Sequence, residues 1–267
     1  MSDSFSPYVA PPNFALVEGR RLAWWSSGSG SPTVVLETGL GAQSAQWQAV
    51  QAAIEPHFRV FRYDRAGRGA SDPAHGARDA TTMVDELAQL LHNAQLPAPW
   101  LLVGHSFGGL LMRLFAQRYR AQTAGLVLVE AMHEAQFNAF GADFVAPSPD
   151  DSVTLNSMRA LWRDGWRDPR TTPEAIDLPA SFRAASAIDT LGDLPLVVIV
   201  AESFARSPFF VAARRSALQH EWERMQASFL ALSSRAELLR APQSEHFVQR
   251  DAPLVIVDAI ERVARRL

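Results

Sequence analysis

Cysteine is absent from the 267-residue sequence. Its absence excludes disulfide bonds, a thiolate nucleophile and zinc sites built from cysteine ligands. The net charge is only −3 and the 25 basic residues are scattered along the chain, so the protein lacks the strong positive field that gathers nucleic acid or an anionic membrane. We therefore expect neither nucleic acid nor a membrane as a partner, and any covalent chemistry must use another side chain.

Long apolar runs are also missing. No stretch approaches the roughly 20 apolar residues needed to span a bilayer, and the opening residues Met1 to Pro7 lack the basic residues and the apolar run of a secretory signal. We therefore expect a soluble, cytoplasmic protein. The sequence leaves its oligomeric state open.

The sequence does contain a regular alternation of short apolar runs and longer segments with helical periodicity. This pattern is typical of an α/β protein, with a mostly parallel sheet covered by helices on both faces. The serine- and glycine-rich stretch 26–31 is expected to form a hairpin turn between the first two strands. The expected strands are 22–25, 33–37, 60–63, 100–103, 125–129, 196–200 and 236–239.

One connection is much longer than the others. Residues 131–194 separate two expected strands that a single crossover helix could join. The segment is rich in aromatic residues and proline, which predicts short helices with a large apolar surface to bury. We expect it to form a helical cap on a core of residues 1–130 and 195–267. Large side chains over a reactive group commonly line a substrate pocket, and the expected substrate contacts are His133, Phe137, Trp162 and Trp166.

The strongest local signal is the stretch Gly104-His105-Ser106-Phe107-Gly108-Gly109, which follows an apolar run and precedes a helical pattern. Such a strand–turn–helix places a serine on a strained, exposed turn at a helix N-terminus, where negative charge is stabilised. Side chains at positions 104 and 108 would collide with neighbouring backbone. The pattern predicts Ser106 as a catalytic nucleophile.

Two further loops complete the expected site. Glu37-Thr38-Gly39-Leu40-Gly41 follows a buried strand, and its Leu40 amide, together with the Phe107 amide, is expected to hold an oxyanion. A histidine that serves as general base must lie on a late loop at the carboxyl edge of the sheet. Of the 7 histidines, only His246 meets this condition.

The resemblance to the α/β-hydrolase family runs from about Arg20 to the C-terminus. It is carried by the stretches 37–41 and 104–109, by Glu245-His246-Phe247, and by Tyr63-Asp64-Arg65-Ala66-Gly67-Arg68-Gly69-Ala70-Ser71-Asp72. The resemblance implies the α/β-hydrolase fold and makes the stretch from Asp64 to Asp72 a structural turn. The sequence departs from the family at Thr38-Gly39, where most members carry histidine-glycine.

The expected reaction is acyl transfer through an acyl-enzyme on Ser106, with a small to medium apolar carboxylic ester as substrate and with neither metal nor cofactor. Lactones, amides, carbon–carbon bonds and perhydrolysis or lyase chemistry remain alternatives on the same residues. A non-catalytic ligand-binding protein of this fold is a further alternative.

The acid that orients His246 has two candidates. The resemblance implies a carboxylate after the strand that follows the cap, where Glu202 lies, or at the end of the strand before the cap, where Glu130 lies. A residue at the very end of a central strand is held more rigidly than one on a following loop. We therefore favour Glu130 over Glu202.

Overall fold

The structure, a computed structural model, describes residues 11–267. The start of the chain, on which the expectation about a secretory signal rests, lies outside the described residues. Within them, no helix is both long enough and apolar enough to cross a membrane.

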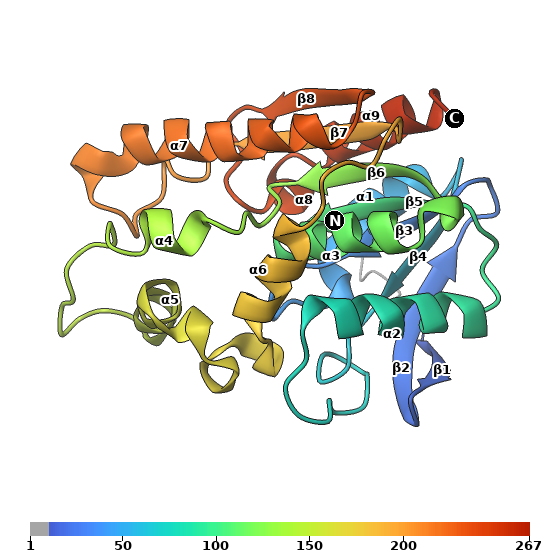
Figure 1. The fold of residues 1–267 in the computed structure, drawn as a ribbon, viewed down its shortest axis with the longest axis horizontal. Coiled ribbons are helices and arrows are strands. Elements are labelled where there is room, and N and C mark those ends of the chain that lie inside the picture. The colour runs from blue at the N-terminus through green and yellow to red at the C-terminus, as the bar shows by residue number, and fades with distance from the viewer. Residues whose placement is uncertain (1–10) are drawn as a thin grey trace, which may run out of the picture.

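One eight-stranded sheet forms the centre of the described chain (Figure 1). Its spatial order is β1-β2-β4-β3-β5-β6-β7-β8. Strands β3 to β8 run parallel, whereas β1 and β2 pair antiparallel with each other and β2 pairs antiparallel with β4. The strands are β1 Asn13–Val17, β2 Arg20–Ser27, β3 Thr33–Glu37, β4 Arg59–Tyr63, β5 Trp100–His105, β6 Thr123–Val129, β7 Leu196–Ala201 and β8 Ala236–Ala241.

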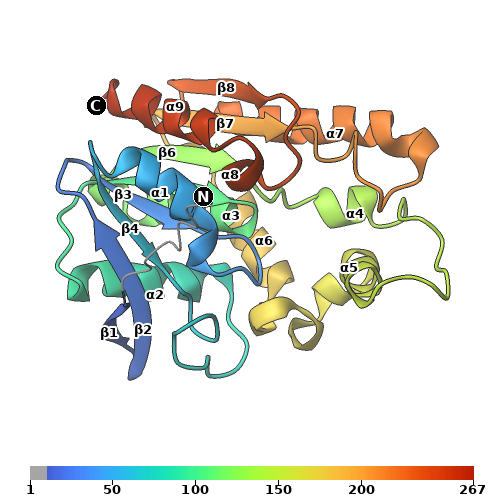
Figure 2. The ribbon, with the colours of Figure 1, turned by 180° about the vertical axis from the view of Figure 1, so that it is seen from behind.

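Helices cover both faces of this sheet (Figures 1 and 2). Helices α2, α3 and α7 lie on one face, and α1, α8 and α9 lie on the other. The helices are α1 Gln48–Ile54, α2 Ala80–Asn93, α3 Phe107–Arg118, α4 Gln136–Phe140, α5 Val153–Arg163, α6 Leu178–Ser186, α7 Arg215–Ser228, α8 Val248–Asp251 and α9 Pro253–Ala264. The predicted fold class, a mostly parallel sheet flanked by helices, is confirmed.

Local chemistry explains why these elements form. Strands β3, β5 and β7 are buried along their whole length, as expected for parallel strands with helices on both sides. Helix α2 begins at Asp79, whose carboxylate accepts a hydrogen bond from the Thr82 amide at 2.8 Å. Its apolar face, which includes Met83 and Leu87, is buried against the sheet.

The expected hairpin between the first two predicted strands is wrong. Those strands, β2 and β3, are not neighbours, because β4 lies between them. The stretch 26–31 instead crosses the end of β4, where the Gly30 carbonyl accepts a hydrogen bond from the Arg59 amide at 3.0 Å. A glycine-rich stretch of this length allows either path, and the buried pairing of β4 with both strands decides it. Strand β1 was not predicted from the sequence.

The segment 131–194 contains α4, α5, α6 and three single turns of 3₁₀ helix between α5 and α6. Helices α4 and α5 project beyond the end of β6 (Figure 1). Aromatic side chains of this segment pack with residues from the connection between β7 and β8, including Phe204 and Trp222. Phe140, Phe144 and Trp162 of the segment are therefore packed against a second connection that was not singled out in the sequence.

Candidate active site

The parallel register brings three functional stretches to one edge of the sheet. Glu37 at the end of β3 pairs with Gly104 of β5, and His105 pairs with Val129 of β6. The loop after Glu37, the turn at Ser106 and the side chain of Glu130 therefore lie side by side.

Ser106 occupies the turn between β5 and α3, as the sequence predicts. Its backbone has φ 54° and ψ −119°, a strained combination for a residue with a side chain. The turn is fixed by a hydrogen bond from the Ser106 amide to the Val129 carbonyl at 3.0 Å, and by one from the Met132 amide to the Ser106 carbonyl at 2.8 Å. The strain at Ser106 is thus maintained by the adjacent strand β6.

Two glycines make this turn possible. A Cβ atom at Gly104 would lie 2.4 Å from the Gly108 carbonyl oxygen, and one at Gly108 would lie 2.5 Å from the Glu37 carbonyl oxygen. Both distances are far inside van der Waals contact, so the expected collision of side chains at 104 and 108 with neighbouring backbone is confirmed.

His246, on the loop after β8, lies beside the turn that contains His105 and Ser106. Its carbonyl is 2.8 Å from Nε2 of His105, and the two imidazole rings lie 4.7 Å apart between centroids. Gln249 Nε2 is 3.3 Å from His105 Nδ1, so His105 donates through Nε2 and accepts through Nδ1 as a neutral ring. Burial lowers the pKa of His105 well below its usual value. His105 therefore attaches the His246 loop to the turn at Ser106.

The Nδ1 atom of His246 lies 3.4 Å from Oε2 of Glu130. The Glu130 side chain is fully buried and follows β6 with a positive φ of 48°. By contrast, the Glu202 side chain makes no hydrogen bond or ion pair with any residue in the range 11–267. Of the two carboxylates considered as the orienting acid, the structure brings Glu130 to His246. No hydrogen bond joins Ser106 Oγ to His246 within the described chain.

Three other groups hold the Glu130 carboxylate. Oε1 accepts from the Ala201 amide at 2.7 Å and from Trp222 Nε1 at 2.9 Å, and the Ser203 hydroxyl donates to Oε2. Trp222 lies on α7 between two glutamines that fix this helix to the sheet. Gln219 donates to the Ala201 carbonyl at the end of β7, and Gln226 donates to the Ala131 carbonyl just after β6. Neither Trp222 nor Ser203 was predicted from the sequence, where the local sign is the polar spacing of Gln219 and Gln226 on one face of α7.

The loop Thr38-Gly39-Leu40-Gly41 lies against the turn at Ser106, since a Cβ at Gly39 would be 3.3 Å from Ser106 Cβ. Phe107 is the first residue of α3 and is fully buried. The two amides predicted to hold an oxyanion, those of Leu40 and Phe107, therefore belong to adjoining backbone stretches on either side of Ser106.

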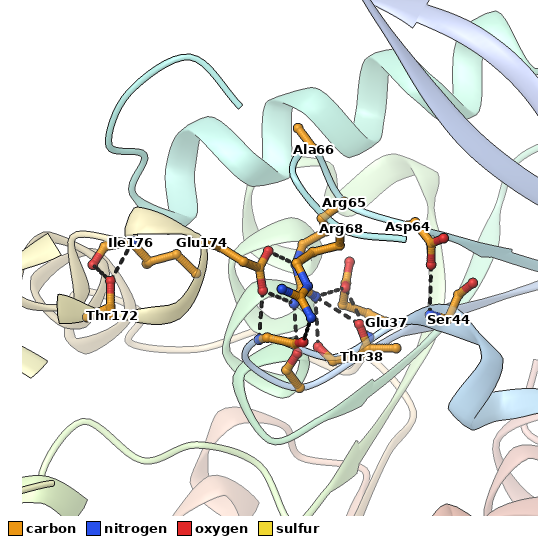
Figure 3. Close-up of polar contacts among 12 residues, drawn as sticks. Glu37, Thr38, Ser44, Asp64, Arg65, Ala66, Arg68, Thr172, Glu174 and Ile176 are labelled. Atoms are coloured by element: carbon orange, nitrogen blue, oxygen red, sulfur yellow. Dashed lines mark hydrogen bonds and ion pairs between the residues drawn. The ribbon is translucent and has the colours of Figure 1, made fainter. Parts of the chain in front are cut away.

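Arg65 braces this loop through its guanidinium (Figure 3). Its Nη1 donates to the Thr38 carbonyl at 2.9 Å and its Nη2 donates to the Gly39 carbonyl at 2.7 Å. Two carboxylates flank the guanidinium. Glu37 Oε1 lies 2.5 Å from Nη1, and Glu174 Oε1 lies 2.7 Å from Nη2. The pairing of Arg65 with Glu174 was not predicted from the sequence, in which the two residues lie more than 100 positions apart.

The three charges are buried together. Burial raises the pKa of Glu37, although the charge of Arg65 acts against it. Burial also acts to raise the pKa of Glu174, but the Arg65 guanidinium and its hydrogen bonds outweigh this effect and hold that pKa below its usual value. The pKa of Arg65 is raised despite burial, because two carboxylates face it.

The turn from Asp64 to Asp72 supports this arrangement, and its expected structural role is confirmed. Asp64 accepts hydrogen bonds from the Ser44 amide at 2.9 Å and from the Ala70 amide at 3.1 Å (Figure 3 shows the first). The Arg68 guanidinium donates to the Gly41 carbonyl. Residues of the turn thus hold the loop that follows β3.

The residues predicted to contact a substrate pack largely on one another. The Phe137 ring lies 4.9 Å from Trp162 and is stacked 5.6 Å from Trp166, between centroids. His133 accepts from the Ala135 amide at 3.1 Å and rests against the Phe229 ring. Burial lowers the pKa of His133. Their role in substrate binding stays a prediction.

A cavity of about 450 Å³ opens between α4, α5 and the loop that joins them. Phe137 lines it together with Phe144 and the arginines Arg159, Arg163 and Arg167, but neither Ser106 nor His246 does. This cavity is therefore separate from Ser106 and His246. Among residues 11–267, no three histidine or carboxylate side chains gather in a way that could hold a metal ion.

Several known proteins are similar to this chain over most of its length. Over 234 residues the chain is 28% identical to the uncharacterized protein YqjL of Bacillus subtilis, covering 87% of this chain and 83% of that protein. It is 27% identical over 241 residues to an AB hydrolase superfamily protein of Gibberella zeae, covering 88% of this chain and 65% of that protein. A thermophilic esterase from Thermogutta terrifontis superposes with a TM-score of 0.66 at 20% identity, over 96% of this chain and 97% of the esterase.

A family profile described as the alpha/beta hydrolase fold matches residues 32–198, which contain the loop after β3, the turn at Ser106 and Glu130. The sheet order and the position of Ser106 between β5 and α3 agree with that match. The chain belongs to the alpha/beta hydrolase fold family.

Proposed function

We propose that this protein is a serine hydrolase that cleaves small to medium apolar carboxylic esters through an acyl-enzyme on Ser106. The observation that carries the proposal is the contact of His246 Nδ1 with Glu130, 3.4 Å long, beside a strained serine at a helix N-terminus. A nucleophile, a base and an orienting acid in one place are the constellation of nucleophilic acyl transfer.

Each group has its own proposed role. Because Nδ1 of His246 faces Glu130, its Nε2 is the ring nitrogen available to Ser106. In the proposed first step Nε2 takes the hydroxyl proton as Ser106 Oγ bonds to the carbonyl carbon, and the proton then passes to the leaving alcohol. In the second step a water molecule, which loses its proton to His246, attacks the acyl-enzyme, and the carboxylic acid is released from Ser106. Hydrogen bonds between such groups often tighten only when substrate binds.

Two amides are proposed to stabilise the charge that develops on the carbonyl oxygen. The Phe107 amide lies at the start of α3, where the helix dipole favours negative charge. The Leu40 amide comes from the loop that Arg65 holds. Donors fixed before the reaction are worth more than mobile ones, because they need no reorganisation in the transition state.

The substrate class rests on two features. The segment 131–194, which we propose as the cap, has Phe137, Trp162 and Trp166 in one aromatic cluster, and an apolar cap favours an apolar acyl group. The Thermogutta terrifontis protein of the same fold is described as an esterase. An apolar ester is therefore the substrate to test first.

Labelling by a fluorophosphonate tests the proposal, because only an activated serine reacts rapidly with it. We expect the folded protein to be labelled and a Ser106→Ala variant to remain unlabelled. A wild-type protein that labels no faster than this variant would leave only a ligand-binding role. A series of p-nitrophenyl esters of rising chain length then identifies the preferred acyl group.

A further inference from the structure

We propose that Glu174, acting through Arg65, is a positioning residue that aims the Leu40 amide at the oxyanion. The inference rests on the proposed function and adds a role for the segment 131–194 beyond covering the site. Figure 3 shows the arrangement: Glu174 approaches from the segment 131–194, Arg65 from the turn after β4, and both meet the loop after β3.

The planarity of the peptide bond carries the first step. The Gly39 carbonyl and the Leu40 amide belong to one trans peptide unit, so they point in opposite directions. Arg65 Nη2 holds the Gly39 carbonyl at 2.7 Å, which fixes the direction of the Leu40 N–H away from the guanidinium. The next peptide unit is held as well, because the Gly41 amide donates to Glu174 Oε1 at 2.7 Å. Leu40 therefore has a fixed peptide unit on each side.

Arg65 holds this position because Glu174 holds Arg65. Glu174 accepts from Nε at 2.9 Å and from Nη2 at 2.7 Å, a bidentate pair in which the side chains are 2% and 0% exposed. Such fork-to-fork pairs fix orientation as well as distance. The nitrogen that binds Gly39 is one of the two that bind Glu174. A shift of the carboxylate would thus move the guanidinium and the loop together.

The backbone at Glu174 is strained. It has φ 67°, and Ala175 after it has φ 52°, a region that residues with a side chain rarely adopt. The strain persists because the Thr172 hydroxyl bonds both the amide and the carbonyl of Ile176, at 2.7 and 2.9 Å, and the Arg78 amide bonds the Ala175 carbonyl at 3.2 Å. Strained residues held in this way cluster at functional sites.

The balance of buried charge among Arg65, Glu37 and Glu174 determines which substitution can be made without unfolding the protein. Without Arg65, the carboxylates of Glu37 and Glu174 would be left buried and unpaired, so an Arg65 variant is expected to misfold. Without Glu174, Arg65 keeps Glu37 at 2.5 Å as its partner, and the buried pair stays neutral. A Glu174→Ala variant is therefore expected to fold while its loop loses one support.

The test compares Glu174→Ala, Glu174→Gln and the control Asp151→Asn on the best p-nitrophenyl ester. Asp151 belongs to the same segment and pairs with Arg159 at 2.9 Å, but it does not contact the loop after β3. Loss of one oxyanion donor costs about 10²–10³-fold in kcat, and a misdirected donor should cost less. For Glu174→Ala we expect a roughly 10- to 100-fold fall in kcat with KM within about threefold.

Two further measurements separate positioning from stability. Affinity for a phenylboronic acid, whose serine adduct resembles the tetrahedral intermediate, should fall in parallel with kcat in Glu174→Ala, and Glu174→Gln should recover part of both. Asp151→Asn should lower only the melting temperature. If Glu174→Ala matches Asp151→Asn in kcat and boronate affinity, the positioning role is refuted while fluorophosphonate labelling of the wild type still supports the proposed function. An unlabelled wild type would overturn both.

Discussion

Replacing Glu130 with glutamine changes one oxygen of the carboxylate to an amino group. In the wild type Oε1 accepts from the Ala201 amide at 2.7 Å and from Trp222 Nε1 at 2.9 Å. Oε2 accepts from the Ser203 hydroxyl and lies 3.4 Å from His246 Nδ1. The backbone amide of Ala201 cannot turn, so the glutamine oxygen should stay with it. The new NH₂ group then points at two groups that both donated to the carboxylate.

His246 can relieve this conflict by changing tautomer, which turns Nδ1 into an acceptor and places the proton on Nε2. An imidazole in that form cannot accept the proton of Ser106. The same amide substitution in a serine–histidine–carboxylate triad costs about 10⁴-fold in kcat, or about 5.4 kcal/mol of activation free energy. Trp222 Nε1 keeps the glutamine oxygen as its acceptor, whereas the Ser203 hydroxyl loses its acceptor, which should cost about 0.5–1.5 kcal/mol of stability.

The assay is kcat for Glu130→Gln on the preferred p-nitrophenyl ester, with urea unfolding followed by tryptophan fluorescence to show that the variant is folded. Glu202→Gln is the matched control, because the Glu202 side chain has no polar partner among the described residues. We expect its kcat to stay within about twofold of the wild type. A folded Glu130→Gln variant within about tenfold of wild-type kcat would refute the assignment, and the reverse pattern would transfer the acid role to Glu202.

Three other outcomes are expected. His246→Ala should lower kcat by about 10³-fold or more and leave the protein folded, since this loop side chain is 37% exposed; activity within about tenfold of wild type would contradict its role. Because burial holds the pKa of His105 below that of the unfolded chain, the unfolded state takes up the proton first. As pH falls below about 6.5, the wild type should lose up to about 1.4 kcal/mol of unfolding free energy per pH unit relative to His105→Gln, and parallel urea-unfolding profiles would exclude this. Trp162→Ala should cost about 3–5 kcal/mol and change the rate ratio of long to short esters; an unchanged ratio would limit Trp162 to packing.

Patterns confined to a few neighbouring residues were readable from the sequence. Seven of the strands follow from short apolar runs. For β3, β5 and β7 the physical reason is that a parallel strand covered on both faces must be apolar along its length. The setting of Ser106 between strand and helix follows from glycines that are required where backbone approaches backbone. Strand β1 was missed, since three of its five residues are exposed and the apolar signal is weak.

The pairing of distant groups was decided only by the tertiary structure. The contact of Glu130 with His246 and Trp222 joins β6, the loop after β8 and α7, and no local pattern specifies which strand end faces which loop. The order of β4 between β2 and β3 is of the same kind, because pairing partners are chosen by the burial of the whole sheet.

Arg65 shows this division most clearly. The sequence by itself determined that a glycine-rich loop follows a buried strand and that Thr38 replaces the usual histidine. The sequence could not indicate that Arg65, from the turn after β4, and Glu174 would both meet at this loop. Buried charges are stable only when their partners arrive together, and that condition is met by the arrangement of three separate chain segments in space.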